Sequence, residues 1–207
     1  ASTFRRLRPR PAWPEPQPSD DPPRRGALRD FHHRRPHALA AAGGGLNAGT
    51  CKRDITPISP SLAGAYAAAF GTPGVVNHTD PVFMAGFGND RQASGYHDRL
   101  WARGVVLENE GTRVAIVAVD LIGYFKNEVD TIRGLVSPDS KIGFVLVSST
   151  HVHEGPDTMG LWGANELSSG IDYGYLDFVN AAVADCIDDA AAHLEKARVY
   201  YATANSA

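Results

Sequence analysis

Two apolar segments near the middle of the chain constrain its fold more than any other feature. Residues 101–108 and 112–121 are rich in Val and Ile and are separated by an Asn-Glu-Gly tripeptide, a combination typical of a β-hairpin. Residues 114–119 are almost continuously apolar, which is typical of a central strand that is covered on both faces. The sequence therefore predicts a sheet with this strand in its interior.

The other periodic segments extend this hairpin into a larger domain. Apolar runs predict further strands, and apolar residues at intervals of three or four predict helices. The predicted strands are residues 49–55, 144–147 and 198–203, and the predicted helices are residues 128–136 and 173–196. Residues 59–89 have scattered Gly and Pro without a sustained period, which indicates a long irregular excursion. This order of elements predicts an α/β fold with a mixed β-sheet and packed helices.

The first 46 residues differ in composition from the rest of the chain. They are dense in Pro and Arg, end in a run of glycines, and show neither helical nor strand periodicity. We therefore expect residues 1–46 to be a disordered N-terminal tail and residues 47–207 to form the folded part. Residues 1–37 carry a net charge of +5 and the remainder −8. The folded part is thus acidic, and nucleic acid is not an expected partner.

The cysteines and the length of the apolar runs limit the class of protein. Cys51 and Cys186 are too few for a disulfide scaffold. We predict two buried thiols, because one cysteine lies in a predicted strand and the other within a predicted helix. The sequence has no run of about 18 apolar residues, so we expect no transmembrane segment. Peripheral membrane contact is compatible with these features.

The segment with the clearest chemistry follows the predicted strand at residues 144–147. Small polar residues lead from it to His151 and His153, so both histidines emerge where a strand leaves the sheet, a common place for ligand crevices. Residues two apart on an extended chain face the same way, and imidazole is a common zinc ligand. The pair can supply two metal ligands, or one ligand and one acid/base group beside the metal. The alternative is a polar turn whose histidines are satisfied by hydrogen bonds.

Two carboxylates and two arginines accompany the histidines. Asp120 ends its predicted strand at the same edge as His151, where it can orient a histidine or a water, or cap the chain. Asp157 can return to hydrogen-bond a ring and set its tautomer. We expect Arg99 and Arg103 to form ordinary ion pairs.

Five segments of the chain occur in the order typical of one enzyme family. They are Asp54-Ile55-Thr56-Pro57, Met84-Ala85-Gly86-Phe87-Gly88, Gly95-Tyr96-His97-Asp98-Arg99-Leu100-Trp101-Ala102-Arg103, Val119-Asp120 and Thr150-His151-Val152-His153-Glu154-Gly155-Pro156-Asp157. Together they resemble the N-terminal part of the catalytic domain of the neutral/alkaline non-lysosomal ceramidases. The resemblance covers residues 48–200.

The resemblance implies a zinc-dependent hydrolase of N-acyl amide bonds in a lipid-like substrate. Ceramide, which is cleaved to sphingosine and a fatty acid, is the type case. The resemblance assigns zinc binding to His151 and acid/base roles to His153 and His97. Val152 and Glu154 stand where the family has Thr and Ser. A secreted or periplasmic location is also implied by the resemblance alone.

The family completes its zinc site with a further histidine, a glutamate and a tyrosine that lie downstream of the His-x-His segment. In this chain His193 is the only later histidine, and it does not join the apolar stripe of its predicted helix. We therefore expect an incomplete catalytic domain, either a fragment or a degenerate copy, that has little activity by itself.

Two other functions remain open. One is another metal hydrolase that uses His-x-His. A metallo-β-lactamase-like site requires His-x-His-x-Asp-His, but Gly155 and Pro156 stand in place of the Asp and the last His. The other is a non-catalytic binding or structural module that keeps the same sheet.

Overall fold

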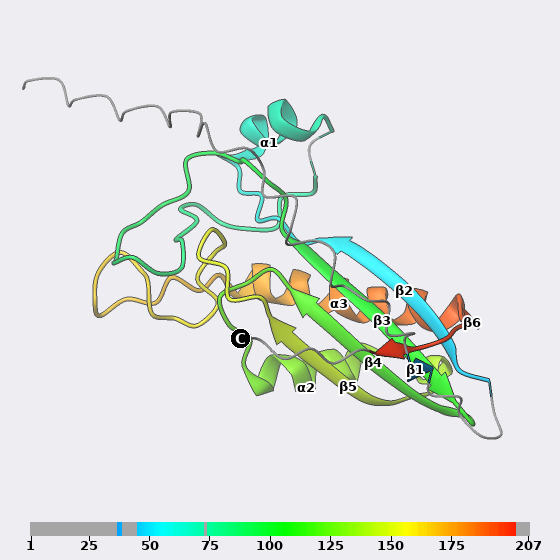
Figure 1. The fold of residues 1–207 in the computed structure, drawn as a ribbon. Coiled ribbons are helices and arrows are strands. Elements are labelled where there is room, and N and C mark those ends of the chain that lie inside the picture. Colours follow the sequence, from blue (N-terminus) through cyan, green and yellow to red (C-terminus); the bar gives the residue numbers. More distant parts are fainter. Residues whose placement is uncertain (1–36, 39–44, 73, 202–207) are drawn as a thin grey trace, which may run out of the picture. The chain divides into compact units, whose positions relative to one another are not determined.

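The computed structural model describes residues 37–38, 45–72 and 74–201, so most of the predicted tail lies outside the described residues. Residues 38–200 form one compact unit, the second of the two into which the chain divides. The helices of the second unit are α1 (Ala63–Phe70), α2 (Lys126–Leu135) and α3 (Tyr173–Ala192), with a 3-10 turn η1 (Pro138–Ser140) (Figure 1). Its strands are β2 (Asn47–Asp54), β3 (Trp101–Asn109), β4 (Thr112–Val119), β5 (Ile142–Ser149) and β6 (Glu195–Lys196). The short strands β1 (His37–Ala38) and β7 (Tyr200–Tyr201) form a sheet of their own.

The main sheet is mixed, as predicted, with the strand order β5-β4-β3-β2-β6. β3 and β4 form the predicted hairpin, and Asn109 pairs with Thr112 across its turn. Glu110 and Gly111 both have positive φ, at 50° and 80°, which is the conformation that a two-residue hairpin turn requires. β4 and β5 are parallel, and α2 lies in the connection between them. The bounds of β2, β3, β4, β5 and α2 lie within two residues of those predicted.

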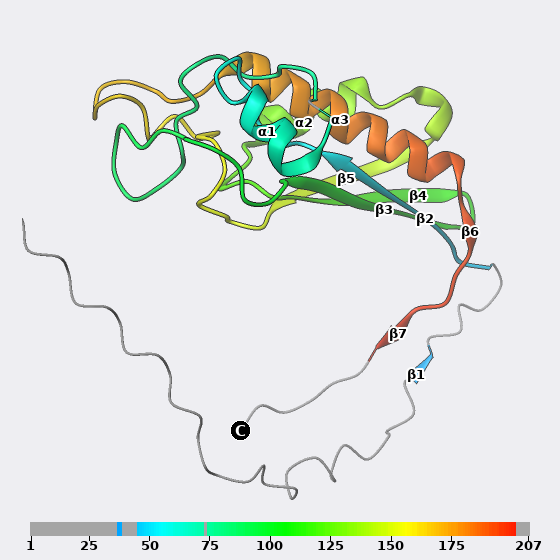
Figure 2. The same ribbon diagram turned by 90° about the horizontal axis from the view of Figure 1, so that it is seen from above.

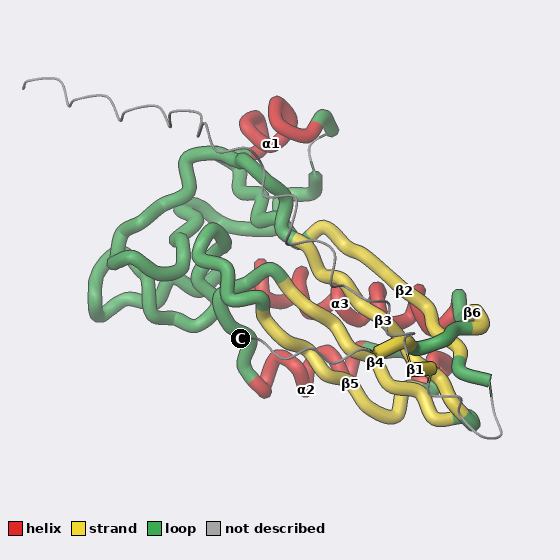
Figure 3. The backbone as a smooth tube through the Cα atoms, viewed as in Figure 1, coloured by secondary structure: helices red, strands yellow, loops and turns green. Residues whose placement is uncertain are grey.

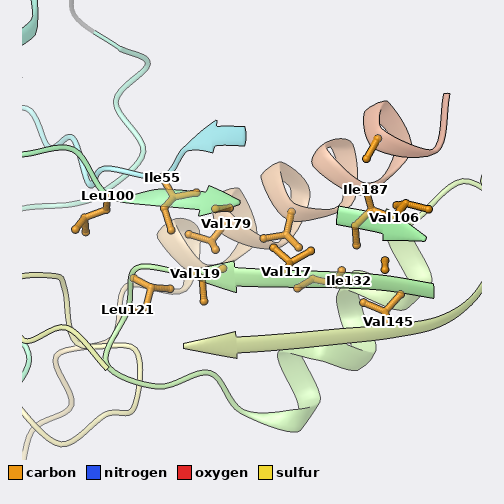
Figure 4. Close-up of a cluster of buried hydrophobic side chains, with 14 of the residues drawn as sticks. Ile55, Leu100, Val106, Val117, Val119, Leu121, Ile132, Val145, Val179 and Ile187 are labelled. Atoms are coloured by element: carbon orange, nitrogen blue, oxygen red, sulfur yellow. The ribbon is translucent and has the colours of Figure 1, made fainter. Parts of the chain in front are cut away.

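The helices α2 and α3 pack on one face of this sheet (Figure 2). The core lies between these two layers (Figure 4). From β4 it takes Ala115, Val117 and Val119, and from α3 it takes Val179, Val183 and Ile187 among others. All six side chains are at most 1% exposed. The sheet and the helix layer therefore bury a continuous apolar core next to the end of β5.

The prediction that β4 is covered on both faces is wrong for the part of the chain that the structure describes. Ile116 of β4 is 40% exposed, and its neighbours on β5, Phe144 and Leu146, are 52% and 42% exposed. Successive side chains of a strand point to opposite faces, so these residues lie on the face opposite to the buried Val117 and Val145. Figures 2 and 3 show that α2 and α3 both lie on one face of the sheet. An apolar run shows that both faces are apolar but does not show that something covers each of them.

The two cysteines form a disulfide, so the prediction of two free buried thiols is wrong. The Cα atoms of Cys51 in β2 and Cys186 in α3 lie 5.2 Å apart. A Cβ atom on Gly49 would lie 1.9 Å from the carbonyl oxygen of Ala190 in α3. The glycine therefore lets α3 approach β2 closely enough for the bridge, a contact that the separate patterns of strand and helix do not reveal.

The C-terminal elements also differ from the prediction. The helix predicted for residues 173–196 ends at Ala192, and Glu195–Lys196 pairs as β6 with the edge strand β2. Pairing with an open sheet edge thus outweighs the helical pattern of the last turn. In the strand predicted for residues 198–203, only Tyr200–Tyr201 is a strand, and residues 202–203 lie outside the described residues.

The excursion predicted for residues 59–89 contains a helix, α1, which the sequence analysis missed. Its run of alanines favours a helix, but eight residues are too few to show a clear period. Within the described parts of the chain, no helix is both long and apolar enough to span a membrane.

Candidate functional site

The segment after β5 runs along the end of β4. The amide of Thr150 donates to the Val119 carbonyl (3.0 Å), and the amide of His151 donates to the Leu121 carbonyl (3.1 Å). His151 has a φ of 62°, a left-handed conformation that is uncommon and strained for a residue other than glycine. Such strain persists only where the surrounding structure enforces it, and it concentrates at functional sites.

A backbone carbonyl orients the ring of His151. Its Nδ1 lies 2.8 Å from the carbonyl oxygen of Ile122. A carbonyl oxygen can only accept, so Nδ1 donates, and in the neutral ring Nε2 keeps its lone pair. Histidines that ligate metals are usually held in this way through their second nitrogen. Because His151 is exposed, a ligand can approach it.

The ring of His153 packs among aromatic rings. Its centroid lies 5.2 Å from that of His151, with the two planes at 85°, 5.0 Å from Phe87 and 6.4 Å from Trp162. The two histidines meet, as predicted, but not through an extended chain, because His151 is left-handed. Nδ1 of His153 is buried and has no hydrogen-bond partner among the described residues, which is unusual for a buried polar atom.

The loop that holds Phe87 lies directly against His153. The amide of Ala85 donates to the Gly155 carbonyl (3.0 Å), which joins this loop to the His-x-His segment. Gly86 has a φ of 81°, and a Cβ atom there would lie 2.0 Å from Nδ1 of His153. Two of the five segments that carry the family resemblance therefore meet in space, and the backbone approaches the ring at a position that only glycine tolerates.

Arg91, which the sequence analysis did not single out, joins the same two segments. Its Nη1 donates to the carbonyl oxygens of Ala85 (3.1 Å) and His153 (2.7 Å). Its Nη2 lies 2.6 Å from both carboxylate oxygens of Glu154. The only signal in the sequence was Glu154 itself, an acid at a position where the resembled family has Ser.

Asp157 holds the loop that follows the histidines. Its buried carboxylate accepts four backbone N–H groups, from Met159 (2.9 Å), Gly160 (2.8 Å), Trp162 (3.0 Å) and Gly170 (3.1 Å). Among the described residues, its hydrogen bonds therefore go to the loop that carries Trp162 and not to an imidazole ring. Through Trp162, Asp157 positions one wall of the site around His153.

Asp120 joins three segments at the edge of the sheet. Its Oδ2 accepts from the first amide of β3 (3.0 Å) and from Arg103 (2.9 Å), and its Oδ1 accepts from the Thr150 hydroxyl (3.2 Å). The contact with Thr150 reaches the residue before His151 but not the ring. Arg103 forms this ion pair with Asp120, and Arg99 forms another with Asp54 at 3.3 Å. The predicted ion pairing of both arginines is confirmed.

His97 lies at a pocket beside the histidine pair. The pocket has a volume of about 620 Å³, and its lining includes His97, Val152 and Glu154, but neither histidine of the pair. The His97 side chain is 98% exposed, and its Nδ1 lies 2.7 Å from Asp98. This hydrogen bond to the carboxylate raises the pKa of His97. His97 thus shares this pocket with Val152 and Glu154 of the His-x-His segment.

The described residues meet part of the requirement for a zinc site. Zinc sites usually have four ligands, or three protein ligands and a water. The imidazole of His151 fits such a site, because Ile122 holds its tautomer, whereas Nδ1 of His153 is buried against Gly86. Nowhere in the described ranges do three or more His, Cys, Asp or Glu side chains gather in a metal-binding group.

The fold of the chain is similar to that of neutral ceramidase. It matches the crystal structure of neutral ceramidase from Pseudomonas aeruginosa with a TM-score of 0.53 and 20% identity, covering 74% of this chain and 22% of that chain. A structure of a ceramidase complexed with C2 matches with a TM-score of 0.52 and 22% identity, with the same coverage. No family model and no curated protein sequence matches the chain. The predicted resemblance is therefore confirmed for the fold, and the chain spans 22% of the length of these structures.

Proposed function

We propose that this chain carries part of the active site of a zinc-dependent hydrolase that cleaves N-acyl amide bonds in ceramide-type lipids. The chain has a fold similar to that of part of neutral ceramidase, and this similarity supports the proposal. The observation that carries it is His151, a strained residue whose Nδ1 is held by a backbone carbonyl and whose ring lies 5.2 Å from that of His153.

Three histidines of the chain would have different roles in amide hydrolysis. His151 would bind the metal through Nε2. When bound, zinc supplies a Lewis acid that polarises the amide carbonyl and lowers the pKa of a bound water. His153 lies beside this position and can move a proton toward the departing amine, and the rings of Phe87 and Trp162 lie next to its own. His97 can assist from the neighbouring pocket.

Exposed apolar side chains support a lipid-like substrate. Phe87, which packs against His153, is 80% exposed, and Leu161, next to Trp162, is 59% exposed. Exposed apolar groups that form one contiguous patch mark surfaces that bind apolar partners. We therefore expect these loops to contact the lipid phase, as a peripheral membrane contact would require.

The chain alone should bind zinc weakly and turn over little substrate. Two imidazoles make fewer bonds than the three or four protein ligands of known zinc sites. Release of fatty acid from an N-acyl sphingosine by the 207-residue chain should stay near background. Robust turnover would show that the remaining ligands lie within these residues.

Calorimetric titration with zinc, repeated with cobalt and followed by visible absorption, tests the metal site. The wild-type chain should bind one metal ion, His151→Ala should bind none, and His153→Ala should bind less tightly. His193→Ala is the matched control, because His193 is 75% exposed and bonds to Asp189 at the far end of α3. Equal titrations of the wild type and His151→Ala would contradict the proposal. A folded wild type without zinc would favour a non-catalytic module.

A further inference from the structure

We infer that Arg91 is a positioning residue that sets where the ring of His153 stands. Its guanidinium ties the His-x-His segment to the loop of residues 84–88. The inference concerns the geometry of the site and deepens the proposed function, on which its metal-binding part rests. No motif in the sequence assigns this role to Arg91.

The two arms of the guanidinium make different contacts. Nη1 bridges two backbone carbonyls, of Ala85 at 3.1 Å and of His153 at 2.7 Å. Nη2 makes an ion pair with Glu154 at 2.6 Å. One planar group therefore bonds to both segments, and it fixes the separation of Ala85 from His153. A lysine ammonium is a compact point charge without this planar fork and cannot reproduce the geometry.

The distance between Ala85 and His153 determines which groups surround the His153 ring. Gly86 follows Ala85, and its backbone lies so close to the ring that a Cβ atom would stand 2.0 Å from Nδ1 of His153. The guanidinium also lies over the ring of Phe87, 5.4 Å from its centroid, and Phe87 packs on His153. Arg91 thus holds the backbone of His153, the glycine against its ring, and one aromatic wall.

The hydrogen bonds from Arg91 to the two carbonyl oxygens position the His153 ring more than the ion pair with Glu154 does. The Glu154 side chain is 69% exposed, whereas the Arg91 side chain is 28% exposed. Solvent screens an ion pair with a partner as exposed as this, and such pairs contribute little to stability. The carbonyl oxygens, by contrast, are fixed points on the two segments. Glu154 therefore serves to orient the guanidinium that binds them.

The first test uses the metal-free chain, so that its result does not depend on the proposed function. Nitrogen and proton chemical shifts of the histidine rings are compared at one pH by long-range NMR correlation. Arg91→Gln and Arg91→Lys should both shift the ring signals of His153 and leave those of His193 unchanged. Arg133→Gln is the matched control, because Arg133 also bonds to a carboxylate (Asp130) and a backbone carbonyl, but from α2.

Two further variants separate the arms of the guanidinium. Glu154→Ser removes only the ion pair and should move the His153 signals less than Arg91→Gln does. The exchange Arg91→Glu with Glu154→Arg restores an ion pair but not the carbonyl bonds, and it should not return the signals to their wild-type positions. If the exchange does restore them, the ion pair is the positioning element and the role given to the carbonyl bonds is wrong.

The second test measures metal affinity. Loss of a group that supports a metal site from outside its ligands typically weakens metal binding about 10- to 100-fold. Because Arg91 acts on His153, which lies beside the metal ligand His151, Arg91→Gln should weaken cobalt binding by at most about 10-fold, the lower end of that range, and Arg133→Gln should leave it unchanged. His153 signals and cobalt affinity that are the same in Arg91→Gln as in the wild type would overturn the inference. If the wild type binds no metal but the His153 signals still move in Arg91→Gln, the proposed function fails and the positioning role stands.

Discussion

At the scale of single residues, the histidines differ in what fixes their rings. His78 is buried, its Nδ1 lies 2.7 Å from the Thr79 carbonyl and 3.2 Å from Asp172, and burial lowers its pKa. A neutral histidine held in this way anchors a loop to the start of α3. His151 is exposed and left-handed, whereas the free ring nitrogen of His78, Nε2, is buried without a partner among the described residues. This contrast favours His151, and not His78, as the residue that meets a ligand.

A methyl group added at Gly86 tests how closely the backbone there approaches the ring of His153. Gly86→Ala places a Cβ atom into the ring of His153 at a φ of 81°. The free energy of unfolding should fall by about 1–3 kcal/mol because of the strained backbone and the displaced ring. Urea denaturation followed by circular dichroism measures the change.

Gly64→Ala is the control for this substitution. Gly64 lies in α1, and a Cβ atom there meets no atom within 4 Å, so the change should be neutral or stabilising by up to about 1 kcal/mol. Equal stabilities of the two variants would show that the backbone of Gly86 does not approach His153 as closely as the structure indicates.

At the scale of elements, a disulfide and two ion pairs join β2 to α3. The disulfide joins these elements across 135 residues of sequence, and Arg53 of β2 binds Asp185 and Asp189 of α3 at 2.6 and 3.0 Å. Disulfides persist in oxidising compartments. The bridge between β2 and α3 is therefore expected to depend on the redox conditions around the protein.

Loss of the bridge should destabilise the fold without altering the histidine pair. The double variant Cys51→Ser with Cys186→Ser should lose about 2–4 kcal/mol of unfolding free energy, because the unfolded chain gains conformational freedom. Chemical denaturation with and without a reductant measures the loss, and the wild type under reducing conditions should match the variant. Alkylation of both cysteines in the unreduced, denatured wild type would contradict the bridge.

At the scale of the whole unit, the described residues 45–72 and 74–200 form a sheet with helices on one face (Figure 2). The other face carries a row of apolar side chains that includes Ile116 and Leu146, which pair across β4 and β5. The unit therefore has one buried apolar face and one partly exposed apolar face, although residues 114–119 of β4 are all apolar.

Neighbouring residues of β4 should differ in how much stability the same polar substitution costs. Val117 is 1% exposed and faces the helices, so Val117→Thr should cost about 1–3 kcal/mol by burying a hydroxyl. Ile116→Thr should cost less than about 1 kcal/mol, because Ile116 is 40% exposed. Thermal denaturation of the two variants gives the comparison. Equal costs would show that the outer face is buried in solution.

The sequence by itself determined the elements whose signals are local. The hairpin of β3 and β4, the helices α2 and α3 and the position of His151 and His153 after β5 all follow from apolar periods and turn residues within about 20 positions. The mixed sheet follows from the order of these elements, and five short segments were enough to indicate the ceramidase-like fold. α1 was missed because eight residues are too short to show a period.

Only the tertiary structure decided the contacts that make the site and the bridge. Arg91 meets His153 across 62 positions of sequence, and Cys51 meets Cys186 across 135. Hydrophobic periodicity reports which side of an element is apolar, but it contains no information on which distant segment lies there. The path of the loops and the close packing at Gly49 and Gly86 set those distances, and they arise only when the whole chain is folded.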